Sequence, residues 1–194
     1  MWAKRGRLVL ALALGMTSGT AFAAGCNDPS GFPAWLKNFE AQALAAGISP
    51  AVVASALDGL SYAPDVVQKD RAQRVFSQTF LEFSDRMVAK YRLQQGAALM
   101  KKYSKIFARI DKDYGVPAPV IVGFWGLETD FGANLGDMPT LRSLATLAYD
   151  CRRPELFHDQ LMAALQVIQR GDLTAAQMKG PWAGELGQVQ FLAT

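Results

Sequence analysis

The stretch GFWGLETDFG, residues 123–132, places one acidic side chain, Glu128, directly after a run of bulky apolar residues. On a helix, Glu128 shares a face with Phe124 and Trp125, which precede it by four and three residues. Aromatic neighbours that exclude water favour the neutral form of a carboxyl group, and a general acid needs that proton. The alternative is a structural acid that caps the helix end or forms an ion pair. The pattern alone leaves both interpretations open.

Other kinds of catalytic chemistry find few suitable residues in this sequence. The chain has one histidine, His158, and two cysteines, so it offers no convincing metal-ligand set. It contains neither a Gly-x-Ser-x-Gly motif nor a Gly-x-x-x-x-Gly-Lys phosphate loop. We therefore expect no metal and no cofactor. Most glycosidases use two carboxylates, and no acid is spaced to pair locally with Glu128, which favours a reaction that needs only one.

The first 23 residues are typical of an export signal. MWAKRGR is positively charged, LVLALALGM is a short apolar run, and AFA supplies small residues before a cleavage point at Ala24. We expect residues 1–23 to be a signal peptide and residues 24–194 to be a periplasmic protein without a membrane span. Without the signal, basic and acidic residues are equal in number, so the sequence gives no reason to expect a nucleic-acid partner.

The two cysteines, Cys26 and Cys151, are expected to form a disulfide, because an even number of cysteines in an exported protein favours pairing. The bond would tether the mature N-terminus to the middle of the chain. The alternative takes FAAGC as an imperfect lipoprotein signal, in which Cys26 carries a lipid anchor. The mass of the intact exported protein distinguishes the two.

Apolar periodicity and helix-terminating residues predict a mainly α fold with no convincing strand. Ser49 is expected to cap one helix at its N-terminus, and Gly115 to end another. A helix that follows two prolines is expected to carry Glu128 and to end near Asp130. Residues 68–95 are expected to form one long helix. Its apolar stripe, expected to pack in the core, consists of Phe76, Phe80, Phe83, Met87 and Tyr91.

Three motifs, in this order and spacing, resemble the membrane-bound lytic murein transglycosylase B family. They are GFWGLETDFG, TLRSLATLAYDCRRPELF and KGPWAGELGQVQFL. The resemblance spans about residues 30 to 194 and extends to the wider lysozyme-like superfamily. It implies that residues 24–194 are the N-terminal part of a lytic transglycosylase catalytic domain, a lysozyme-like helical domain that is incomplete at its C-terminal side. The implied partner is the glycan strand of peptidoglycan, and no cofactor is implied.

The family's mechanism would assign two successive roles to Glu128. As general acid it would protonate the glycosidic oxygen of the β-1,4 bond between N-acetylmuramic acid and N-acetylglucosamine. As general base it would then accept the proton of the C6 hydroxyl of the muramic acid, which attacks the anomeric carbon and gives a 1,6-anhydro product. Because the nucleophile belongs to the substrate, one protein carboxylate is sufficient.

The resemblance also implies roles for residues outside the helix of Glu128. Gln190 would hydrogen-bond the glycan or position Glu128, while Gly187 and Phe191 would shape the floor of the cleft. Arg152 and Arg153 would meet carboxylates of the stem peptide, or else lie in a solvated region before a helix. Trp182 would stack on a sugar ring, or else belong to the core.

The sequence also departs from the family pattern. Pro181 stands where a serine is common, and the proline expected two residues after Phe191 is replaced by Ala193. Because family members continue beyond this length, we expect the 194-residue chain alone to fold poorly or to be inactive. Two other functions stay open. One is a lysozyme-type hydrolase in which Glu185 or a later acid activates water, and the other is a non-catalytic peptidoglycan-binding protein.

Overall fold

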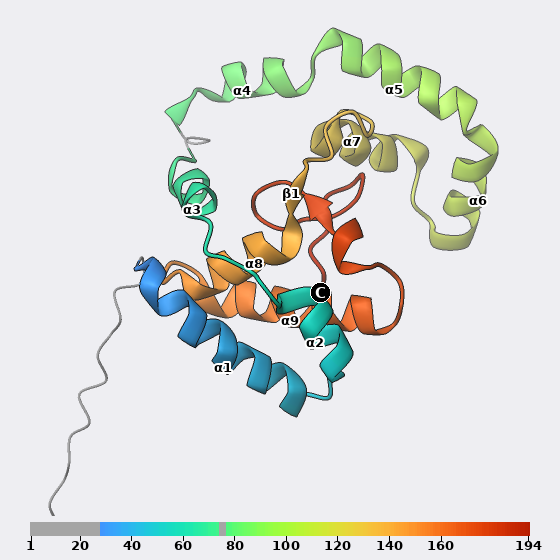
Figure 1. Cartoon of the computed structure of the whole chain (residues 1–194). Helices are drawn as coiled ribbons and strands as arrows, with labels where there is room; N and C mark the ends of the chain where they lie inside the picture. The colour runs from blue at the N-terminus through green and yellow to red at the C-terminus, as the bar shows by residue number, and fades with distance from the viewer. Residues whose placement is uncertain (1–27, 74–76) are drawn as a thin grey trace, which may run out of the picture.

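The computed structural model describes residues 28–73 and 77–194 and confirms a mainly α fold (Figure 1). In these ranges, two short 3-10 helices, η1 Pro29–Gly31 and η3 Ala175–Gln177, and two short strands accompany the α-helices. The α-helices are α1 Phe32–Ala45, α2 Pro50–Leu57, α3 Pro64–Arg71, α4 Phe80–Met87, α5 Lys90–Lys102, α6 Ser104–Tyr114, α7 Ala118–Thr129, α8 Thr140–Tyr149 and α9 Pro154–Gln169. None of the helices in these two ranges is long and apolar enough to cross a membrane.

The hydrophobic core lies among α1, α2, α3, α8 and α9, which we call the body. Helix α8 runs through its centre: Leu144 and Leu147 are almost completely inaccessible to solvent, as are Leu161 and Leu165 on α9. The buried positions on α9 recur three or four residues apart, as expected for one packed helix face, whereas α8 is buried on nearly all sides. The body therefore provides a rigid platform for the connections at either end of α8.

Helices α4 to α7 form a second group, which we call the arm. In Figure 1 the arm passes over the body as an arch that runs from α3 back to β1. Helix α4 has no buried residue, and only Gly96 of α5 and Phe107 of α6 are buried. The arm therefore has little apolar core of its own.

The expectation of one long helix over residues 68–95 is wrong. Helix α3 ends at Arg71, α4 begins at Phe80, and α5 begins at Lys90 after a further break. Thr79 and Glu82 form a capping box, in which each side chain accepts a hydrogen bond from the other's backbone N–H. This reciprocal capping starts a new helix where the apolar stripe suggested continuity. The described stripe residues Phe80, Phe83 and Tyr91 are not core either, since they are exposed, and Phe76 lies outside the described residues.

Other local signals are confirmed. The Ser49 hydroxyl accepts a hydrogen bond from the backbone N–H of Val52 at 3.3 Å and so caps α2. Gly115 ends α6 in the left-handed conformation, with φ +67°. Helix α7 begins directly after Pro117 and ends at Thr129, one residue before the predicted end. The sequence therefore located the helix of Glu128 well.

Two strands of two residues each were not predicted. Strand β1, Met138–Pro139, pairs antiparallel with β2, Lys179–Gly180. Two residues are too few to show an alternating pattern, so periodicity could not reveal them. The pairing brings the segment that follows β2 next to the connection between α7 and α8. A Cβ at Gly136 would collide with the backbone of Gly180, so this approach requires glycine.

Candidate functional site

Glu128 lies in the last turn of α7 with its side chain exposed to solvent. The buried face of α7 consists instead of Val122, Gly126 and Thr129. Phe124 is 58% exposed, so the expectation that it excludes water from Glu128 is wrong. The physical reason is that α7 packs against α5 and α6 through its other face. The carboxyl group is therefore presented at an open surface.

Thr129, the next residue, ties this helix end to the glycine-rich segment. Its side chain is buried, and its hydroxyl donates to the carbonyl oxygen of Gln188 at 2.6 Å. The Thr129 hydroxyl oxygen in turn accepts a hydrogen bond from the backbone N–H of Gly132 at 3.0 Å. A Cβ at Gly132 would also press on the Gln188 side chain, so the two segments lie in direct contact. Sequence reasoning missed Thr129, because its partner is 59 residues away.

The chain reverses direction immediately after α7. Asp130 and Phe131 both have left-handed backbone conformations, with φ of 53° and 61°. Asp130 forms an ion pair with Arg92 of α5 at 3.1 Å and accepts a hydrogen bond from the Tyr91 hydroxyl at 3.1 Å. Phe131 folds back over Gly126 and packs edge-on against the Trp125 ring. These contacts fix the turn after α7 to α5 and to α7 itself.

The glycine-rich segment, residues 184–191, forms a compact turn. Leu186 and Phe191 pair through two backbone hydrogen bonds of 2.8 and 3.1 Å. The Gln190 side chain donates to the carbonyl oxygen of Gly187 at 2.7 Å, so in this structure it holds the turn together. Phe191 is 70% exposed and Gly187 is open to solvent, which suits a surface that receives a ligand. Trp182 packs against the core.

Arg152 and Arg153, between α8 and α9, both bind a buried acid that sequence reasoning missed. Asp70 of α3 is 1% exposed, and its two carboxylate oxygens lie 2.7 Å from Arg152 and 2.5 Å from Arg153. Arg152 also donates to the backbone carbonyl of Asp70 at 2.6 Å. A neighbouring buried acid, Asp150, pairs with Arg71 at 2.6 Å. Both arginines therefore have a structural role, while part of each side chain stays exposed.

Glu185, within the glycine-rich segment, is a second acidic residue of this region. Its Oε2 atom is buried and has no hydrogen-bond partner among the described residues. Burial raises the pKa of Glu185, its own backbone N–H lowers it, the charge of Glu128 raises it, and Arg153 lowers it, in decreasing order of effect. Glu185 therefore lies within electrostatic range of both Glu128 and Arg153.

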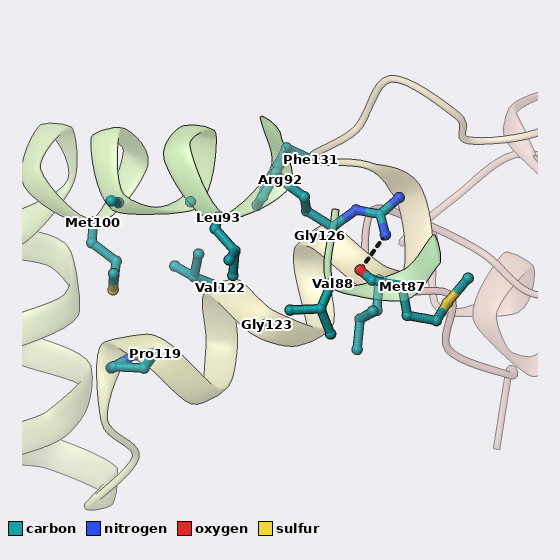
Figure 2. Close-up of a pocket in the computed structure, with 13 residues that line it drawn as sticks. Met87, Val88, Arg92, Leu93, Met100, Pro119, Val122, Gly123, Gly126 and Phe131 are labelled. Atoms are coloured by element: carbon teal, nitrogen blue, oxygen red, sulfur yellow. Dashed lines mark hydrogen bonds between the residues drawn. The ribbon is translucent and has the colours of Figure 1, made fainter. Parts of the chain in front are cut away.

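A separate apolar cavity of about 270 Å³ lies on the α5 side of α7 (Figure 2). Figure 2 shows Leu93 and Met100 of α5 pointing toward Val122 and Pro119 of α7, with Met87 and Val88 at one end. Glu128 does not line this cavity. The cavity therefore borders the helix that carries Glu128, but it is separate from the surface formed by α7 and residues 184–191.

Some expectations concern residues outside the described ranges. The signal peptide, residues 1–23, and Cys26 both lie there. The pairing of Cys26 with Cys151 therefore stays a prediction, with lipid attachment at Cys26 as its alternative. Within residues 28–73 and 77–194, no group of three or more His, Cys, Asp or Glu side chains is arranged to hold a metal ion.

Known proteins resemble this chain over most of its length. The sequence profile of the transglycosylase SLT domain matches residues 31–194. Membrane-bound lytic murein transglycosylase B of Escherichia coli (strain K12) is 31% identical over 114 residues, which are 58% of this chain and 32% of that protein. SltB3 from Pseudomonas aeruginosa, solved in complex with NAG-NAM-pentapeptide, superposes with a TM-score of 0.79 and 40% identity.

The SltB3 match covers 84% of this chain and 43% of that chain. A more distant structure, Slt35 from Escherichia coli in complex with bulgecin A, has a TM-score of 0.72 at 24% identity, over 81% of this chain and 51% of that chain. At that identity the likeness concerns the fold alone. The chain thus spans 32% of the curated relative and 43% of SltB3.

Proposed function

This chain belongs to the transglycosylase SLT domain family, and on that premise we propose that it cleaves peptidoglycan as a lytic transglycosylase. The observation that carries the proposal is a direct contact between two segments that lie far apart in the sequence. The end of α7, which presents Glu128, is bound to the glycine-rich turn through the hydrogen bond from Thr129 to Gln188. The relative SltB3 was solved with NAG-NAM-pentapeptide, which supports peptidoglycan as the substrate.

In this proposal Glu128 acts first as general acid and then as general base. It gives its proton to the glycosidic oxygen between N-acetylmuramic acid and N-acetylglucosamine. It then takes the proton of the C6 hydroxyl of the same muramic acid, whose oxygen attacks the anomeric carbon to form the 1,6-anhydro ring. The exposure of Glu128 suits this role, because the carboxyl group must reach an oxygen of a bulky polymer.

The surrounding residues receive supporting roles in the same proposal. Gly187 and Phe191 form the open floor beside Glu128, and Gln190 orders that floor through its bond to the Gly187 carbonyl. The exposed parts of Arg152 and Arg153 attract carboxylates of the stem peptide, although Asp70 already neutralises part of their charge. The remaining candidate, Trp182, acts through the core, because it packs there.

The location and the covalent state of the protein are proposals of the same kind. We propose that residues 1–23 direct export to the periplasm, where peptidoglycan lies, and that Cys26 pairs with Cys151. Intact mass spectrometry of the exported protein tests both. Cleavage before Ala24 and a mass two hydrogens lower than that of the reduced chain are expected. A mass increase from acyl chains on Cys26 would contradict the disulfide.

The decisive test of function is product analysis. The full chain is incubated with purified sacculi, and the released muropeptides are separated and weighed. We expect 1,6-anhydro ends from the wild-type protein and a loss of at least 100-fold in Glu128→Gln, because the amide cannot transfer the proton. Circular dichroism of both proteins serves as the folding control. Release of anhydro-muropeptides by this 194-residue chain would contradict the expectation from the sequence that it is inactive alone.

Other products would identify other functions. Reducing ends would indicate hydrolysis by an activated water, and equal glycan binding without release by wild type and Glu128→Gln would indicate a binding protein. The structure disfavours Glu185 as the activator of water, because one of its carboxyl oxygens is buried and burial favours its neutral form.

A further inference from the structure

The arm carries a concentration of positive charge. Residues 86–109, which we call the basic stretch, run from the last turn of α4 into α6 and contain seven basic residues and no acidic one. They are Arg86, Lys90, Arg92, Lys101, Lys102, Lys105 and Arg109. Because residues 24–194 contain 17 basic and 17 acidic residues, all of the acids lie outside this stretch. The arm is therefore the positive pole of a molecule that is acidic elsewhere.

Much of this charge is available to an external partner. Arg92 pairs with Asp130 at 3.1 Å, and Arg109 pairs with an acid on its own helix. By contrast, the exposed side chains of Lys90 and Lys101 on α5 form no ion pair with any residue in the described ranges. Figure 1 shows α4 and α5 on the outer side of the arm, away from the body. An anion can therefore approach these two lysines.

Lys90 and Lys101 share a helix face with residues that line the apolar cavity. Leu93 and Ala97 both line the cavity and lie four residues apart on α5. Lys90 precedes this pair by three residues and Lys101 follows it by four, so both lysines lie on the same side of the helix. Leu93 is 60% exposed. A lysine therefore stands at each end of an apolar stripe that leads into the cavity.

The cavity itself offers an apolar lining and no free polar side chain. Arg92 is the one polar residue among those that line it. Its guanidinium group is already engaged, since it donates to the Met87 carbonyl oxygen at 2.6 Å and pairs with Asp130. Val88 and Leu127 are exposed at the rim, and Figure 2 shows Val88 at one end of the cavity. Such a lining suits a hydrocarbon chain, to which methionine side chains adapt readily.

We propose that the arm docks on the surface of an anionic phospholipid bilayer, with Lys90 and Lys101 at the headgroup phosphates and an acyl chain in the cavity. A phospholipid is the occupant because it joins a negative group to a hydrocarbon chain in one molecule. A soluble anion would leave the cavity empty, and an apolar peptide would leave the lysines without a partner. Attachment to a membrane surface commonly combines a basic patch with an apolar contact.

The first test measures binding to vesicles. The exported protein is sedimented with vesicles of phosphatidylglycerol and phosphatidylcholine in equal parts, or of phosphatidylcholine alone. We expect binding to the anionic vesicles only, weakened by salt, and roughly 30-fold weaker in the double variant Lys90→Gln with Lys101→Gln. The control Lys37→Gln with Lys69→Gln removes the same charge from exposed positions on α1 and α3 and should bind as wild type. All proteins share one N-terminus, so its contribution cancels.

Two results of this experiment would overturn the proposal. Equal binding to both kinds of vesicle would show that the lysines do not recognise the headgroup. An equal loss of binding in the two double variants would show that net charge governs binding and that the arm has no special part in it.

The second test asks whether an acyl chain enters the cavity. Methionine methyl groups are labelled with 13C, and the protein is mixed with phosphatidylglycerol bicelles that contain a lipid with a nitroxide on its acyl chain. Met87 and Met100 line the cavity and should lose their NMR signals, whereas Met162 and Met178 pack in the body and should keep theirs. In Gly123→Leu, whose Cβ would meet no atom within 4 Å, the new side chain should fill the cavity and preserve the Met100 signal.

The outcomes of the second test distinguish a lipid from other occupants. Signals retained at Met87 and Met100, or lost at all four methionines, would contradict entry of an acyl chain into the cavity. A second copy of this chain on the same surface would shift the Met87 and Met100 signals with protein concentration in the absence of lipid. That result would replace the membrane with a dimer and so refute the proposal.

Discussion

At the scale of single residues, the site depends on which hydrogen-bond partners the buried polar atoms have. Thr129 uses its hydroxyl both as donor, to Gln188, and as acceptor, from Gly132. Its neighbour Glu128 stays exposed because the buried face of α7 ends with Thr129. One residue thus anchors the helix end, and the next is free to meet a ligand. Oε2 of Glu185 is one of the buried polar atoms without a hydrogen-bond partner among the described residues, and the consequence for Glu185 is measurable.

Glu185 is expected to make stability depend on pH. Because its pKa is raised in the folded state, the folded protein keeps a proton that the unfolded chain loses above about pH 4.5. The free energy of unfolding should therefore fall as pH rises from that value through the raised pKa. Urea unfolding of wild type and Glu185→Gln over this range measures the effect, which the variant should lack.

The comparison with Glu185→Gln isolates this contribution, since both proteins keep every other titrating group. The difference in free energy of unfolding between them should change with pH only in that window. A difference that is constant with pH would show that Glu185 acts through packing and has no raised pKa.

What the sequence predicted of individual residues depended on how far away their partners lie. Glu128 was placed correctly near a helix end, since that placement needs only local signals. Whether it is buried was left open, because periodicity identifies a helix face without revealing what covers it, and the structure shows it exposed. Asp70 was missed altogether: its partner Arg153 lies 83 residues away, and no spacing rule spans that distance. The roles given to Gln190 and Phe191 stay predictions.

At the scale of elements, the ionic cluster around Asp70 fixes α3 to the junction of α8 and α9. The buried carboxylate binds Arg152 and Arg153 at once. Without that charge, two half-exposed guanidinium groups would lose their partner, and the buried site would lose its best hydrogen bonds. Arg153 at this junction also lowers the pKa of Glu185 through its positive charge. The cluster therefore supports the site as well as the body.

Asp70→Asn is expected to lower the free energy of unfolding by about 2–3 kcal/mol, somewhat less than for a completely buried pair because the arginines stay partly hydrated. Asp65→Asn on the same helix is the matched control. Its ion pair with Lys69, at 3.9 Å, is half exposed, so a change of about 0.5 kcal/mol or less is expected. Chemical denaturation measures both, and equal effects would show that the Asp70 cluster contributes nothing special.

Two glycines of α7, Gly123 and Gly126, allow a direct comparison between an open position and a tightly packed one. A Cβ at Gly126 would lie 2.8 Å from the Phe131 ring, whereas a Cβ at Gly123 would have no neighbour within 4 Å. Gly126→Ala should therefore destabilise by about 1–3 kcal/mol through overpacking. Gly123→Ala should instead stabilise by up to about 1 kcal/mol through helix propensity.

Thermal or urea unfolding of the two variants tests whether they change the free energy of unfolding in opposite directions. If both substitutions stabilised the protein, the Phe131 ring would have to move aside at no cost, and the turn after α7 would be softer than the structure indicates.

The elements themselves were predicted unevenly, for a physical reason. Capping by Ser49 and termination at Gly115 are decided within a few residues, and both were correct. The break before α4 was missed because the apolar stripe and the capping signal at Thr79 conflict, and the capping signal prevailed. The strands were missed because they depend on tertiary pairing between residues about forty positions apart.

At the scale of the whole molecule, burial is divided unequally between body and arm. Eight residues of α8 are buried, whereas α4 has none and α5 and α6 have one each. Several large apolar side chains of the arm are exposed, among them Phe80, Leu81 and Leu93. The body should therefore be the stable unit of the molecule, and the arm should be held mainly by its ends.

Hydrogen exchange should resolve these two parts, because the free energy of local opening follows buried apolar contact. We expect amides of α4, α5 and α6 to exchange well before those of α8 and α9, with α7 intermediate because Thr129 anchors its end. Thr129→Val keeps the shape but removes the bond to Gln188, so exchange in α7 and residues 184–191 should increase while α8 and α9 stay protected. Thr129→Ser, which keeps the hydroxyl, should resemble wild type. Uniform acceleration across the body would mean that the Thr129 bond stabilises the entire fold, and that arm and body open together.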